Sequence, residues 1–174
     1  MIDVSIRPYR ASDLDALLQG IHESVPELCR WMPWCHPGYS VRDGQGWLQE
    51  QLAAFARGSA FEFAVIAADG QYCGGCGVNQ LAGGSRRANL GYWIRSSMTR
   101  RGIASEAVRL VREWAFEHTD LVRLEVVVAV ENLASQRVAE KAGAFREGIL
   151  RSRLMLQGST HDAVMYSFSR TVGH

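Results

Sequence analysis

The order of elements between residues 88 and 130 constrains the fold more than any other feature of this chain. Residues 88–94 and 124–130 are rich in β-branched, aromatic and other apolar side chains, which is typical of strands. The segment between them carries apolar residues at helical spacing, namely Ile103, Ala107, Leu110, Val111 and Trp114. This order predicts two parallel strands joined by a right-handed crossover. Because residues 124–130 are almost continuously apolar, we expect that strand to be covered on both faces.

The rest of the chain predicts antiparallel neighbours for this central pair. Strand patterns occur at residues 2–8, 61–67, 72–81, 149–156 and 163–168. Asp69 and Gly70 join two of these strands as a hairpin. Further helices are expected to begin at Ser12, Ser24, Val41 and Asn132. The predicted fold class is therefore α/β (α+β), with a mixed, mostly antiparallel twisted sheet of about seven strands, a central parallel pair and helices on both faces.

Length and composition describe an ordinary globular chain. The 174 residues fit one domain spanning residues 1–174, with 47% hydrophobic and 21% charged side chains. A formal net charge of +1 gives no bulk attraction to nucleic acid or to an anionic membrane. No apolar run is long enough to cross a bilayer, and residues 1–7 alternate like a strand and have no secretory apolar region. We therefore expect a cytoplasmic protein without nucleic-acid or membrane partners.

The four cysteines, Cys29, Cys35, Cys73 and Cys76, are expected to be free thiols, as is usual in a cytosolic chain. Cys73 and Cys76 form a C-x-x-C pair, which elsewhere binds zinc or carries out redox chemistry. Structural zinc sites usually have two closely spaced ligand pairs, and Cys29 and Cys35 are too widely spaced to form the second. The C-x-x-C also falls inside a predicted strand and not at a helix start. The sequence therefore predicts no metal.

The turn before the long helix has the residue types that a phosphate group needs. A helix begins with unpaired backbone N–H groups and carries about half a positive charge at this end. Gly102 lets the backbone approach a ligand closely, and Ala104 is small enough not to block it. The expected diphosphate contacts are Arg100, Arg101, Gly102, Ile103, Ala104 and Ser105. The alternative is a capped helix start with solvated arginines.

This turn resembles the Gln/Arg-x-x-Gly-x-Gly/Ala motif of the GCN5-related N-acetyltransferase (GNAT) superfamily, with Thr99 in place of Gln or Arg. Residues 132–145 begin with Asn132-x-x-Ser135 and end in Lys-Ala-Gly-Ala-Phe. They resemble the Rim-type branch, whose members acetylate the N-termini of ribosomal proteins. The resemblance covers most of the chain and is strongest from residue 92 to residue 145.

The resemblance implies the GNAT fold and an acyl-CoA-dependent N-acyltransferase. Acetyl-CoA would be the cosubstrate, with succinyl-CoA or another short acyl-CoA as an option. The acceptor would be a primary amine, such as a protein N-terminus or a small molecule, that attacks the thioester directly in a ternary complex. Homodimers are common in the family. The alternative is a non-catalytic acyl-CoA-binding or sensing module, which would keep the turn but lack a usable acid and base.

The resemblance also assigns residues to the acyl arm of the cosubstrate. In the family, the strand before the turn carries a bulge and diverges from the next parallel strand, so that pantetheine pairs with its backbone. The corresponding residues here are Tyr92, Trp93 and Ile94. One backbone N–H would face the thioester oxygen and stabilise the oxyanion. The alternative is a plain core strand, since these side chains are common in strands.

Asn132 and Ser135 are assigned in the same way. The family residue at Asn132 bonds the pantetheine arm, and the serine at Ser135 lies near the CoA sulfur. Its hydroxyl would hydrogen-bond or protonate the departing thiolate. Asparagine is also a preferred helix N-cap, so a purely structural role fits Asn132 as well.

Glu125 is the candidate general base. An α-amino group has a pKa of about 7.7–8.0, so part of it is already neutral near pH 7 and needs little help. Glu125 is the only acid in the apolar run 124–130, and alternation places it on the same face as Val127 and Ala129. Partial desolvation there would raise its pKa. The alternative is an ion pair with Arg123 or another arginine of the sheet.

Trp31 and Trp34 are the candidate acceptor-binding residues, because their segment resembles one near the acceptor pocket in this branch. The alternative is ordinary aromatic packing under a loop. Arg151 and Arg153 would meet an acidic acceptor or acyl group, or remain solvated at an edge. Some members of the branch have a glutamate in the penultimate strand where this chain has Leu154. The ribosomal-protein substrate therefore does not carry over directly.

Overall fold

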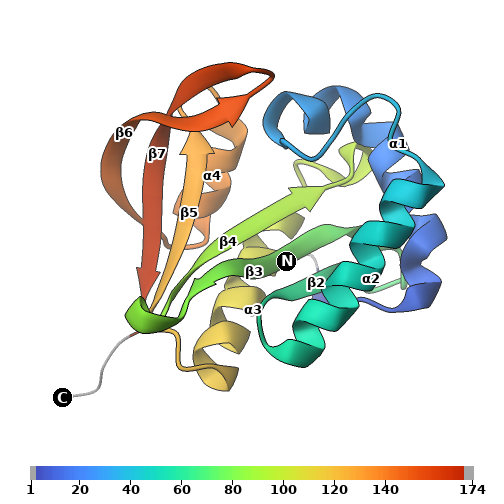
Figure 1. The fold of residues 1–174 in the computed structure, drawn as a ribbon, viewed down its shortest axis with the longest axis horizontal. Coiled ribbons are helices and arrows are strands. Elements are labelled where there is room, and N and C mark those ends of the chain that lie inside the picture. Colours follow the sequence, from blue (N-terminus) through green and yellow to red (C-terminus); the bar gives the residue numbers. More distant parts are fainter. Residues whose placement is uncertain (1–2, 171–174) are drawn as a thin grey trace.

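The computed structural model describes residues 3–170, and within this range seven strands form one sheet (Figure 1). Their order across the sheet is β1-β2-β3-β4-β5-β7-β6. The strands are β1 (Val4–Pro8), β2 (Phe61–Ala67), β3 (Tyr72–Ala82), β4 (Arg87–Ile94), β5 (Arg123–Ala129), β6 (Phe145–Leu156) and β7 (Ser159–Ser169). β4 and β5 run parallel, and the other neighbouring pairs are antiparallel. The predicted mixed sheet with a central parallel pair is confirmed.

The helices cover both faces of the sheet, as predicted. They are α1 (Leu14–Trp31), α2 (Val41–Arg57), α3 (Ile103–His118) and α4 (Leu133–Lys141). α1 and α2 lie on one face, and α3 and α4 lie on the other (Figure 1). Each face has its own apolar core; Phe63 and Val65 of β2 belong to the core with α3, whereas Ala64 belongs to the core with α1 and α2. Among the helices of residues 3–170, none is both long and apolar enough to span a membrane.

α1 is one helix where the sequence predicted two, the second beginning at Ser24. A short 3-10 turn leads into an uninterrupted helix that passes through Pro26. Proline removes one backbone donor from a helix interior. The buried face nevertheless continues on both sides of Pro26, with Leu17 before it and Leu28 after it. This continuous apolar face compensates for the lost hydrogen bond.

β4 and β5 pair at three positions, Arg87–Arg123, Ala88–Leu124 and Asn89–Glu125. Beyond Asn89, β4 continues along β3, while β5 continues along β7. The parallel strands therefore diverge, as the resemblance implied. The expected bulge in β4 is wrong, because the register shift places the extra residue in β3, between Asn79 and Ala82. Gln80 lies in this segment and accommodates the extra residue with a left-handed φ of 51°.

This divergence also corrects the prediction for β5. The strand is fully buried on the face of Leu124, Val126 and Val128, but Glu125 and Val127 on its other face are only partly buried. The continuous apolar run therefore does not mean burial on both faces. One side of β5 packs in the core, and the other side borders an open space.

The C-terminal hairpin is longer than predicted and reaches across that space. β6 forms the sheet edge, and its register with β7 is irregular between Leu150 and Leu154. At the turn, the side-chain amide of Gln157 donates to the carbonyl oxygen of Cys29 near the end of α1. The tip of the hairpin thus lies against the α1–α2 connection, opposite the diverging strands (Figure 1).

Candidate active site

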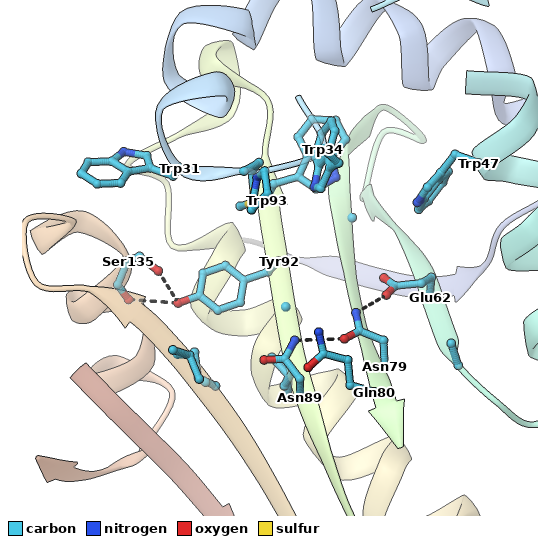
Figure 2. Close-up of a pocket in the computed structure, with 18 of the residues that line it drawn as sticks. Trp31, Trp34, Trp47, Glu62, Asn79, Gln80, Asn89, Tyr92, Trp93 and Ser135 are labelled. Atoms are coloured by element: carbon cyan, nitrogen blue, oxygen red, sulfur yellow. Dashed lines mark hydrogen bonds between the residues drawn. The ribbon is translucent and has the colours of Figure 1, made fainter. Parts of the chain in front are cut away.

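A cavity of about 700 Å³ opens where β4 and β5 diverge. It extends from the start of α4, across β4 and β3, to α2 and the α1–α2 connection (Figure 2). Its lining includes Trp34, Glu62, Tyr92, Trp93, Asn132 and Ser135. The structure therefore brings residues predicted for the acyl arm and for the acceptor into one cavity.

The turn before α3 presents an open helix N-terminus. Gly102 is the N-cap and has a φ of 82°, a left-handed conformation that favours glycine. A Cβ built at this position would meet no atom within 4 Å. The side chain of Ile103 is buried in the core, so this residue can offer a ligand only its backbone N–H. The exposed backbone of this turn is suited to an anion.

A second hollow, of about 250 Å³, lies beside this turn. Its lining residues are Arg101, Gly102, Ser105, Glu106, Arg109, Lys141 and Ala142. Arg109 is held by Glu106 at 2.5 Å and Glu113 at 2.7 Å. Arg100, directly before Arg101 in the chain, is exposed and has a φ of 63°. Three cationic side chains thus line the hollow beside the helix N-terminus.

Tyr92 and Ser135 bridge the gap between β4 and α4. The Tyr92 hydroxyl lies 2.9 Å from Ser135 Oγ and donates to the Ser135 carbonyl oxygen, also at 2.9 Å (Figure 2). Burial raises the pKa of Tyr92, which keeps the hydroxyl protonated near neutral pH. The Ser135 N–H donates to Asn132 Oδ1 at 3.1 Å. Asn132 is therefore the helix N-cap, and it also lines the cavity.

The tryptophans predicted for the acceptor side line the cavity. Trp31 and Trp34 both border it, and the rings of Trp34 and Trp93 meet edge to face with centroids 6.3 Å apart. Trp47 of α2 adds a third wall (Figure 2). Packing and cavity lining thus coexist at these positions, so the two interpretations of the sequence are not exclusive.

The prediction of four free thiols is wrong for two of them. Cys29 and Cys35 form a disulfide that closes the segment carrying Trp31 and Trp34. The end of α1 and the following turn bring their Cα atoms within 4.7 Å, a separation that a disulfide can span. Sequence spacing could not show this approach.

Cys73 and Cys76 are free and buried in β3. Among residues 3–170, no group of three or more His, Cys, Asp or Glu side chains is arranged to hold a metal ion.

Glu125 lies in an ion-pair network at the paired end of β4 and β5. Arg123 Nε is 2.9 Å from Glu125 Oε1, and Arg87 is 3.5 Å from the same carboxylate. Arg123 also contacts Glu147 at 2.6 Å. The cavity wall on β5 begins at the next residue, Val126. The ion-pair alternative weighed for Glu125 is thus present in the structure.

Another carboxylate of the cavity, Glu62 of β2, was not predicted from the sequence. It is partly buried, lines the cavity, and accepts a hydrogen bond from Asn79 Nδ2 at 2.9 Å. Asn89 Nδ2 in turn donates to Asn79 Oδ1 at 3.1 Å (Figure 2). Burial raises the pKa of Glu62 to about 7. The signal was available, because Glu62 is the only acid in the apolar strand 61–67, as Glu125 is in its own.

β6 contributes the remaining wall of the cavity. Arg153, Leu154 and Leu156 line it. Arg151 and Arg153 do not lie on one face of a regular strand, because the register with β7 is irregular between Leu150 and Leu154 and Ser152 has a φ of 48°. Leu154 presents an apolar side chain where the resemblance implied a glutamate in some members of the branch, so this position supplies no general base.

Diverging parallel strands beside an open helix N-terminus define the fold of an N-acetyltransferase. The chain matches the acetyltransferase (GNAT) domain over residues 3–144, which is more than half of its length. It therefore belongs to the GNAT acetyltransferase family, as the resemblance implied.

Similar proteins fall in the Rim-type branch. The "Putative ribosomal N-acetyltransferase YdaF" of Bacillus subtilis is 29% identical over 165 residues, covering 94% of this chain and 90% of YdaF. RimJ of Mycobacterium smegmatis, solved with CoA-disulfide, is 26% identical with a TM-score of 0.86, covering 95% and 81% of the two chains. RimL, an acetyltransferase of ribosomal L7/L12 solved with coenzyme A, has a TM-score of 0.89 at 23% identity, covering 95% and 93%.

Proposed function

We propose that this protein transfers an acetyl group from acetyl-CoA to a primary amine, with a protein N-terminus as the acceptor class. The observation that carries the proposal is the single cavity that joins the Tyr92–Ser135 pair to the tryptophan-walled space beneath the α1–α2 connection. Support comes from the family and from relatives named as ribosomal or ribosomal-protein acetyltransferases. We expect a cytoplasmic protein, and a homodimer stays a prediction from the resemblance.

The cosubstrate would lie along the diverging side of β4. We assign its diphosphate to the turn that contains Arg100, Arg101 and Gly102 and to the N–H groups of residues 103–105. The pantetheine arm would follow the backbone of residues 92–94, which β5 leaves unpaired on one side. A backbone N–H there would stabilise the developing oxyanion by about 3 kcal/mol. Asn132 would bind the same arm from α4.

The chemistry is a direct transfer. The neutral amine nitrogen forms a bond to the thioester carbon, and the carbon–sulfur bond breaks to release CoA thiolate. The thiolate would leave beside Ser135, whose hydroxyl can turn from Tyr92 to donate a hydrogen bond to it, while Tyr92 keeps its bond to the Ser135 carbonyl oxygen. Such donors suit this role because hydrogen bonds to a charged group are stronger than those to a neutral one. Glu125, expected from the sequence, and Glu62 are the two candidate proton acceptors.

Isothermal titration calorimetry with acetyl-CoA tests the proposal at its first step. Wild-type protein should bind acetyl-CoA and acetylate peptides that begin with Ser or Ala. Gly102→Asp should abolish binding, because it places a carboxylate where the phosphates belong and strains a left-handed residue. Gly70→Asp is the matched control, since Gly70 has a φ of 83° and equally open surroundings in a distant hairpin. Wild-type protein that gives no heat with acetyl-CoA would contradict the proposal.

A further inference from the structure

We propose that Glu62 is the proton acceptor for the incoming amine, held in position by a line of hydrogen bonds through Asn79 to Asn89. This inference rests on the proposed function. It adds a residue of β2 to the reaction and provides the base that Leu154 cannot supply.

Hydrogen bonds between neighbouring strands position Glu62 in the cavity. Glu62, Asn79 and Asn89 come from three neighbouring strands, and their side chains form a continuous polar line in the cavity (Figure 2). Asn89 is the last residue of β4 that pairs with β5. The line therefore runs from Glu62 to the point where the two strands diverge, three residues before the β4 backbone of residues 92–94 that we assign to the acyl arm. The acceptor space beneath Trp34 and Trp47 lies in the same cavity.

One oxygen of the Glu62 carboxylate has no hydrogen-bond donor among residues 3–170. Asn79 is the one hydrogen-bond donor that residues 3–170 provide to Glu62, and it contacts only Oε1. No arginine, lysine or histidine in that part of the chain forms an ion pair with Glu62, whereas Arg123 holds Glu125 at 2.9 Å. Glu62 Oε2 packs over Gly77, its partner across β2 and β3, and can accept a hydrogen bond from an ammonium group in the cavity.

Glu62 and the α-amine of a peptide have similar proton affinities. Burial raises the pKa of Glu62 to about 7, close to the value of about 7.7–8.0 for an α-amine. The titratable groups that face Glu62 are Tyr9 after β1 and Cys76 of β3, and Glu50 of α2 and Arg153 of β6 line the same cavity. Burial raises the pKa values of Tyr9 and Cys76 well above the usual range, so both stay neutral near pH 7. Glu62 is then the group suited to exchange a proton with the substrate.

The proton balance is complete without another reactant. An N–H bond of the ammonium group breaks, an O–H bond forms on Glu62, and the nitrogen regains its lone pair. The neutral amine attacks the thioester, and the proton that the nitrogen loses during transfer ends on the CoA sulfur. Glu62 then returns its own proton to solvent. The products are the N-acetylated amine, CoA thiol and the regenerated carboxylate.

The test uses acetyl-CoA with peptides that begin with Ser or Ala. Glu62→Gln should lower kcat/KM for the peptide about 100-fold near pH 7 and leave acetyl-CoA binding within about twofold of wild type. The deficit should shrink above the amine pKa of about 7.7–8.0, because the amine then arrives neutral. A structural defect would persist at every pH. Glu131→Gln is the control, since it makes the same change at a side chain that is 55% exposed.

Two further variants check the assignment. Glu62→Asp should recover part of the activity, since it keeps a carboxylate at this position. Asn79→Ala should move the acid limb of the wild-type pH profile to higher pH, because the hydrogen bond from Asn79 favours the charged form of Glu62. Wild-type kinetics in Glu62→Gln, or a deficit independent of pH, would overturn the inference. So would a wild-type protein that binds acetyl-CoA and acetylates neither peptide, whereas absent acetyl-CoA binding would overturn the proposed function itself.

Discussion

Glu62 and Glu125 are both lone carboxylates in apolar strands, yet the structure gives them opposite surroundings. Glu125 is 16% exposed and lies between Arg123 and Arg87. Glu62 is also partly buried, but its partner is the uncharged amide of Asn79. A carboxylate that loses water without gaining a cation binds its proton more tightly, and this is why the pKa of Glu62 is raised to about 7.

The difference shows that a lone acid in an apolar strand does not by itself indicate a catalytic carboxylate. The identity of its cross-strand neighbours is also needed. Arginines at residues 87 and 123 face each other where β4 and β5 pair, so Glu125 is neutralised within the sheet. Asparagines at residues 79 and 89 occupy the corresponding place near Glu62. Ion-paired carboxylates stabilise a structure, whereas unpaired ones remain free to exchange protons.

The largest expected effect separates the two residues by activity. Glu125→Gln should change kcat/KM for an N-terminal peptide less than about threefold near pH 7, against the loss of about 100-fold expected for Glu62→Gln. The reason is that Glu125 faces arginines beside the cavity wall and Glu62 faces the cavity itself. Steady-state kinetics of both variants with one peptide measure this directly. The reverse ranking would return the role of base to Glu125.

A second effect appears in stability. The folded pKa of Glu62, about 7, lies above its unfolded value of 4.5, so the folded state binds the extra proton between these values. Stability should therefore fall as pH rises through this window, by at most about 3 kcal/mol. Glu62→Gln removes the penalty and should unfold at higher urea concentration than wild type at about pH 8, but not at about pH 4. Identical pH dependence of the two proteins would show that Glu62 is not desolvated.

Much of the fold could be predicted because its signals are local. Asp69 and Gly70 form the predicted hairpin between β2 and β3, and the apolar stripe from Ile103 to Trp114 lies within α3 as expected. The divergence of β4 from β5 came from the resemblance and is confirmed. These features depend on spacing within one segment or on a known family pattern.

The surroundings of Glu62 could not be predicted, because they depend on register between separate strands. Glu62 is opposite Gly77 across β2 and β3, which places Asn79 two residues further along. A shift between Val65 and Ile66 and the extra residue near Gln80 alter this register, and neither leaves a clear mark in the sequence. The disulfide between residues 29 and 35 was missed for a related reason, since the approach of their Cα atoms is made by a turn.

The smallest expected effect is the contribution of an ion-paired carboxylate, Glu147, to stability. Arg123, with help from Ser167, lowers the pKa of Glu147 to about 2. A lowered folded pKa means that the pair stabilises the protein above the unfolded value of 4.5 and that this contribution is lost as pH falls toward 2. Because Glu147 is 34% exposed, solvent screening limits the contribution to about 1 kcal/mol. In urea unfolding, Glu147→Gln should therefore be less stable than wild type near pH 7 and equally stable near pH 2. Glu117→Gln is the control; this residue is 78% exposed, so the variant should be as stable as wild type at both pH values. If Glu147→Gln is as stable as wild type near pH 7, Arg123 does not stabilise the charged form of Glu147, and Glu147 then provides no contrast with Glu62.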